Sequence, residues 1–153
     1  MPKKPPLPFS KGFAAAMLTL AALSATALEF RSAAEHGAVF YDAPSDKAKK
    51  LFVVSRGYPV EVLIDNKDWL RVRDQSGALA WVSRASLSPR RTVVVTAQKC
   101  GVHAMPDAKS ALLFNAERNV VFELIEAGKS GWVKVKHRDG AVGYARIEEV
   151  WGV

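Results

Sequence analysis

The side chains best suited to nucleophilic or metal chemistry are one cysteine and three histidines. Cys100 is the only cysteine, and the histidines are His36, His103 and His137. A nucleophilic thiol needs a base that a third polar group orients, and a zinc site needs about four ligands with paired spacing. Cys100 and His103 lie in a segment typical of a strand and a loop, where their side chains diverge. The sequence therefore predicts no catalytic site, no metal or cofactor site, and no enzyme.

A single cysteine excludes a disulfide within the chain. Two interpretations of Cys100 remain open. It is either a small buried hydrophobic residue, which we favour, or a reactive or intermolecular thiol.

A second pattern interleaves aromatic and cationic residues, and it occurs twice. "DWLRVRDQSGALAWV" begins at Asp68, and "GWVKVKHRDGAVGYA" begins at Gly131. The corresponding pairs are Trp69 and Trp132, Arg71 and Lys134, Val72 and Val135, Gly77 and Gly140, and Trp81 and Tyr144. A repeat of this length indicates that a small domain has been duplicated.

Strand alternation assigns the faces of the repeated segment. Leu70 and Val72 share one face, and the same holds for Val133 and Val135, so these four residues are predicted to be core residues. The opposite face carries aromatic and cationic side chains. This face must point to solvent, because cations are costly to bury without partners. The candidate ligand-binding residues are Tyr41, Trp69, Arg71 and Trp81 in the first half, and Trp132, Lys134 and Tyr144 in the second. Two interpretations of the tryptophans remain open: they form a binding groove, or they cover a barrel edge beneath Arg and Lys stems.

The elements that must position these residues are short strands. Runs of four to six residues rich in Val and aromatics alternate with turns that contain Gly, Pro, Asn and Asp, a pattern typical of all-β barrels or sandwiches. We expect two domains, residues 33–88 and 92–153, joined by the short linker "SPRR". Helix is expected for a turn or two at most, near 45–50 or 147–150.

The N-terminal 27 residues differ from the rest. A start with Lys3, Lys4 and Lys11 is followed by an apolar run of about fifteen residues that ends in Ala25-Thr26-Ala27. We predict a secretory signal peptide, cleaved after Ala27. The protein is then periplasmic or extracellular, and its mature chain has no membrane segment. The alternative is an uncleaved anchor, although a spanning helix needs roughly 20 apolar residues.

The repeats resemble the bacterial Src-homology-3-like (SH3-like) domains of cell-envelope proteins. The first half fits from Val39 through "PVEVLIDNKDWLRVRDQSGALAWVSRASL" to Leu87, and the second from Val102 through "VFELIEAGKSGWVKVKHRDGAVGYARIEEV" to Val150. The resemblance implies two tandem small five-stranded SH3-like barrels and a non-catalytic binding role. It implies an envelope protein or peptide as partner, or alternatively peptidoglycan.

The eukaryotic SH3 domains are a more distant likeness, carried by "VFYDAP" and by the place of Trp69. Their "P-S-N-Y" motif has no counterpart here, where residues 83–86 read Ser-Arg-Ala-Ser and residues 145–148 read Ala-Arg-Ile-Glu. Polyproline recognition of the eukaryotic kind is therefore not predicted.

The charge is net positive at +7, with a pI of about 9.7. A single-stranded nucleic-acid binder is a remote alternative, because small barrels can hold bases on a basic aromatic face. The export signal and the acids among the bases argue against it. The sequence alone leaves open which ligand is bound, whether the barrels bind it jointly, and the oligomeric state.

Overall fold

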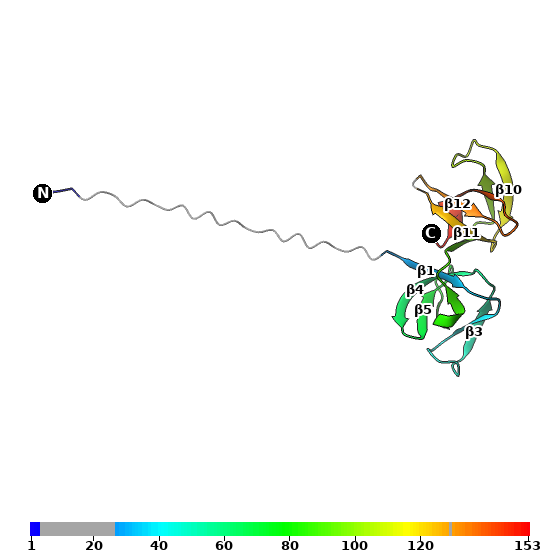
Figure 1. The fold of residues 1–153 in the computed structure, drawn as a ribbon, viewed down its shortest axis with the longest axis horizontal. Helices are drawn as coiled ribbons and strands as arrows, with labels where there is room; N and C mark the ends of the chain where they lie inside the picture. Colours follow the sequence, from blue (N-terminus) through cyan, green and yellow to red (C-terminus); the bar gives the residue numbers. More distant parts are fainter. Residues whose placement is uncertain (4–26, 129) are drawn as a thin grey trace.

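The structure, a computed structural model, describes residues 1–3, 27–128 and 130–153. Two all-β domains lie next to each other (Figure 1). We call residues 29–88 the first domain and residues 92–153 the second domain. The predicted signal peptide lies almost entirely outside the described residues. Among the residues described, no helix has the length and apolar character needed to cross a membrane.

The first domain is one antiparallel sheet of seven strands in the order β3-β2-β6-β5-β4-β1-β7. Its strands are β1 (Glu29–Ala33), β2 (Ala38–Tyr41), β3 (Lys50–Val54), β4 (Pro59–Asn66), β5 (Trp69–Arg73), β6 (Leu79–Ser83) and β7 (Leu87–Ser88). A single 3-10 turn, η1 (Arg84–Ser86), connects β6 to β7.

The second domain repeats this order as β10-β9-β13-β12-β11-β8-β14. Its strands are β8 (Thr92–Val95), β9 (Lys99–His103), β10 (Leu112–Glu117), β11 (Val121–Ala127), β12 (Trp132–Lys136), β13 (Val142–Arg146) and β14 (Val150–Trp151). The 3-10 turn η2 (Ile147–Glu149) occupies the place of η1.

The all-β class and the tandem arrangement are confirmed, but each sheet has seven strands instead of the expected five. In the first domain, β1 pairs with both β4 and the two-residue strand β7. Such short pairings have too little sequence for an alternating pattern to show. Helical structure is limited to η1 and η2 in the described part of the chain. Residues 45–50, where a turn of helix was one expectation, instead form bends and turns at 45–48 and reach the start of β3 at Lys50.

Each domain has its own core on the face that alternation predicted. Leu70, Val72, Val133 and Val135 are each at most 1% exposed. The core prediction is therefore confirmed. Burying one such aliphatic side chain stabilises the fold by about 1.5–3 kcal/mol.

The two domains touch through both apolar and polar contacts. The rings of Phe30 on β1 and Trp151 on β14 meet edge to face, with centroids 5.2 Å apart. The Thr92 hydroxyl donates a hydrogen bond to the Gly57 carbonyl across the boundary at 2.6 Å. The Gln75 amide donates to the Asn119 side-chain oxygen at 3.1 Å. These contacts, together with a linker of three residues between β7 and β8, hold the domains against each other.

Candidate functional site

The outward face of the first domain arranges its candidate residues in rows across neighbouring strands. Tyr41 on β2 is the register partner of Trp81 on β6, which is in turn the partner of Arg71 on β5. In the next row, Trp69 on β5 lies opposite Ser83 on β6. Side chains in register or on a diagonal lie within reach of each other. The sheet therefore brings all four predicted residues of the first half together on one face.

Tyr41 and Trp69 form one wall of a groove. Their rings meet edge to face, with centroids 5.5 Å apart, and both side chains are only partly buried. The groove has a volume of about 540 Å³, and Gly37, Val39, Tyr41, Pro44, Ser45, Asp46, Trp69, Ser83 and Ser86 line it. Trp81 and Arg71 lie beside this groove without lining it.

The second domain repeats the rows with different residues. His103 on β9 pairs with Tyr144 on β13, and Tyr144 pairs with Lys134 on β12. The Lys134 ammonium lies 6.0 Å from the Tyr144 ring centroid. In the next row, Trp132 lies opposite Arg146. Thus His103 takes the position of Tyr41, and Arg146 takes that of Ser83.

The replacement of Tyr41 by His103 and of Ser83 by Arg146 changes the exposure of the tryptophan that the two domains share, Trp69 in the first and Trp132 in the second. The Arg146 guanidinium lies 5.0 Å from the Trp132 ring centroid, and the His103 ring meets Trp132 edge to face at 5.4 Å. Trp132 is consequently only 8% exposed. Ser83 is too short to cover Trp69 in this way. Trp132 therefore fits the edge-covering interpretation, whereas Trp69 remains open to a ligand.

Sequence reasoning missed the partners that decide this difference. It considered His103 beside Cys100, yet the strand register places the His103 imidazole in the position that Tyr41 has in the first domain. It also gave no role to Arg146, or to the loop residues Pro44, Ser45 and Asp46 that line the groove. The turn-forming "DAPSD" was the one available signal for the loop.

Cys100 is fully buried in the core of the second domain. Burial, reinforced by the nearby Glu149 carboxylate, raises the pKa of its thiol to about 12. Because the thiolate is the reactive form, burial and the raised pKa both disfavour reaction of this thiol at neutral pH. The interpretation of Cys100 as a small buried hydrophobic residue is confirmed.

Comparison with known proteins gives one family and several distant structures. The family model for the bacterial SH3 domain matches residues 34–89 and again residues 99–152. No match was found among curated proteins.

The solved structures that are similar include NlpC2 from Trichomonas vaginalis, at 14% identity and a TM-score of 0.38, which covers 82% of this chain and 48% of that one. An NlpC/P60 family protein from Bacillus cereus has 14% identity and a TM-score of 0.36, covering 80% of this chain and 55% of its own. The chain thus spans about half the length of these structures.

Proposed function

The chain belongs to the bacterial SH3 domain family, with two copies of the domain in tandem, and from this premise we propose that it is a non-catalytic binding module of the cell envelope. Its ligand is a segment of an envelope protein or peptide. Cys100 supports a non-catalytic role, since the thiol is buried and its pKa is raised to about 12.

The groove between Tyr41 and Trp69 is the observation that carries the proposal. Partly exposed aromatic rings offer apolar contact area at a small cost in side-chain entropy. Ser45, Ser83 and Ser86 add hydroxyl groups that can donate to or accept from a peptide backbone. Asp46 is the one charged residue in the lining within the part of the chain that the structure describes. It favours a ligand with an amine or guanidinium near the apolar contact and disfavours an acidic ligand.

Export is the second part of the proposal. It is supported by the positive start, the short apolar run and the Ala25-Thr26-Ala27 motif. N-terminal sequencing of the protein from the envelope fraction should begin at Leu28. A sequence that begins at Met1 would contradict cleavage.

A retention experiment tests the proposed ligand. The chain from Leu28 onward is immobilised and exposed separately to envelope extract and to purified cell-wall sacculi. We expect retention of an envelope protein, and its loss in Trp69→Ala, because interface anchors of this type contribute about 2 kcal/mol or more. Leu79→Ala is the matched control, since Leu79 is 46% exposed and does not line the groove.

The outcomes separate the possible ligands. Retention only on sacculi, lost in Trp69→Ala, would replace the protein ligand with peptidoglycan. Equal retention by the wild type, Trp69→Ala and Leu79→Ala would exclude the groove as the binding site. Thermal denaturation of each variant shows whether the compared proteins are folded.

A further inference from the structure

A larger concavity lies between the two domains. It has a volume of about 980 Å³, at the upper end of the range for ligand sites. The first domain contributes its side from β1 and the turn before β4, and the second contributes β11 and the turn after β12. Arg90, in the linker, completes the lining. We call this concavity the interdomain cleft.

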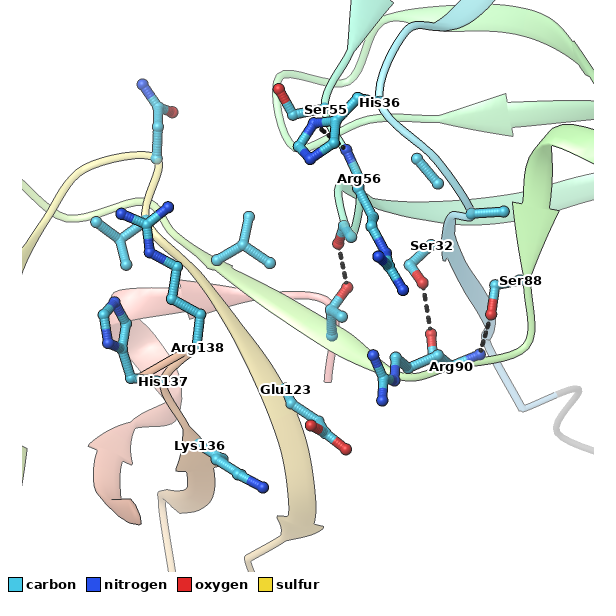
Figure 2. Close-up of a pocket in the computed structure, with 17 residues that line it drawn as sticks. Ser32, His36, Ser55, Arg56, Ser88, Arg90, Glu123, Lys136, His137 and Arg138 are labelled. Atoms are coloured by element: carbon cyan, nitrogen blue, oxygen red, sulfur yellow. Dashed lines mark hydrogen bonds between the residues drawn. The ribbon is translucent and has the colours of Figure 1, made fainter. Parts of the chain in front are cut away.

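The lining of the interdomain cleft is cationic on both sides. Arg56 and Arg90 approach from one side, and Lys136 and Arg138 from the other, as Figure 2 shows. Among the described residues, Glu123 is the only carboxylate in the lining. It is the register partner of Lys136 across β11 and β12, so it offsets one of the four cationic charges.

These four cations form no direct ion pair among the described residues. Within residues 27–128 and 130–153, no carboxylate lies within 4.0 Å of their charged groups, whereas four arginines elsewhere are paired in this way. The paired arginines are Arg31, Arg73, Arg84 and Arg146. The four cationic side chains of the cleft lining are therefore not neutralised by an ion pair among the described residues.

The floor of the cleft is held in place by hydrogen bonds that do not use the cationic groups. The Ser32 hydroxyl donates to the Arg90 carbonyl at 2.9 Å (Figure 2). The Thr92 hydroxyl donates to the Gly57 carbonyl at 2.6 Å. The charged ends of Arg56 and Arg138 remain exposed and make no hydrogen bond among the described residues. They are therefore free to contact a ligand.

A cleft lined by charges of one sign concentrates the potential and attracts counter-ions. We propose that the interdomain cleft binds a ligand that carries two or more phosphate groups. Arginine presents a planar set of donors that fits phosphate oxygens two at a time, and three of the four cations are arginines. Cations that approach from both sides fit a ligand with two or more anionic groups, one for each side.

The cleft and the Tyr41–Trp69 groove are separate sites. They share no lining residue, and their charges favour opposite ligands, since the groove contains Asp46 and the cleft an excess of cations. The proposal therefore does not depend on the ligand proposed for the groove.

Calorimetric titration of the chain from Leu28 onward, at low ionic strength, tests the cleft. The probes are inorganic tripolyphosphate, inorganic phosphate and citrate. The key variant is the double charge reversal Arg56→Glu with Arg138→Glu, one change on each side. Its control is Lys50→Glu with Lys109→Glu, which changes the net charge equally at exposed positions outside the cleft.

We expect tripolyphosphate to bind more tightly than phosphate or citrate. The key variant should lose about 100-fold in affinity, since each lost charge-assisted contact corresponds to about tenfold. The control should lose less than about threefold, from long-range charge alone. Arg56→Ala and Arg138→Ala should each weaken binding, because the ligand spans both sides.

Three results would overturn the proposal: equal losses of affinity in the two double variants, citrate binding as tightly as tripolyphosphate, or weaker binding in only one of the two single variants.

A parallel experiment uses vesicles of phosphatidylcholine with phosphatidic acid. Vesicle binding that the key variant loses identifies a lipid headgroup as the source of the phosphate. Binding of tripolyphosphate alone identifies a soluble phosphorylated ligand.

Discussion

Truncation of the two central tryptophans should have opposite consequences. Trp132 is 8% exposed, and an aromatic side chain of its size buries about 200 Å². At about 25 cal/mol per Å², that burial stabilises the second domain by about 5 kcal/mol. Alanine keeps part of this and the site relaxes, so Trp132→Ala should lower the free energy of unfolding by about 3–5 kcal/mol.

Trp69→Ala should cost about half as much stability, because the ring is only partly buried and Ser83 leaves it uncovered. Its main effect should fall on retention of the groove ligand. Trp132→Ala should leave that retention unchanged at a temperature where the variant is folded. The reason is that Arg146 and His103 already cover the Trp132 ring.

Urea denaturation followed by far-UV circular dichroism measures the stabilities, and Trp132→Phe is the control that keeps a buried ring. Two domains need not unfold as one unit, so the transition of the second domain is compared between variants. Equal losses of stability in Trp69→Ala and Trp132→Ala would contradict the claim that Arg146 covers Trp132 while Trp69 stays uncovered. So would loss of ligand retention in folded Trp132→Ala.

Three further predictions concern the folded state. In the same denaturation assay, Leu70→Ala should lower the free energy of unfolding by about 2–5 kcal/mol and Arg71→Ala by less than about 1 kcal/mol. Similar losses in the two variants would show that the two faces of β5 are assigned the wrong way round. Glu61 is 4% exposed and accepts two hydrogen bonds from Arg73, at 2.6 and 2.9 Å, so Glu61→Gln should cost about 1–3 kcal/mol; an unchanged urea midpoint would contradict this. Cys100 should react with a thiol reagent only after unfolding. The pKa of its thiol in the native protein is about 12, above the ordinary value of 9.0, so the unfolded chain loses this proton at a lower pH. The free energy of unfolding should therefore fall as the pH rises from 9.0 to about 12, by up to about 1.4 kcal/mol per pH unit. This extra slope should be absent in Cys100→Ala.

Local patterns were sufficient to predict the fold class and the core faces. Leu70 and Val72 alternate with Trp69 and Arg71, and a two-residue period assigns faces from neighbours in the chain alone. The short strand β7 could not be predicted in this way, because two residues hold no period.

The state of the candidate site depended on contacts that local patterns do not contain. Whether a tryptophan is covered depends on the side chain opposite it on the next strand, Ser83 or Arg146, and therefore on strand register. The interdomain cleft was missed for the same reason. Arg56 and Arg138 are far apart in the chain, and only the packing of the two domains brings them to one concavity.

The domain interface also has a consequence for ligands long enough to reach both concavities. The contact of Phe30 with Trp151 and the hydrogen bond from Thr92 to Gly57 hold the two domains in one arrangement, so a ligand that bound both concavities would have to match the distance between them. Once one end of such a ligand is bound, the second site is at a high effective concentration for the other end. This holds only if the length of the ligand matches the distance between the two sites. Selection would then depend on the spacing between a cationic and an anionic group along one ligand, in addition to the affinity of either end.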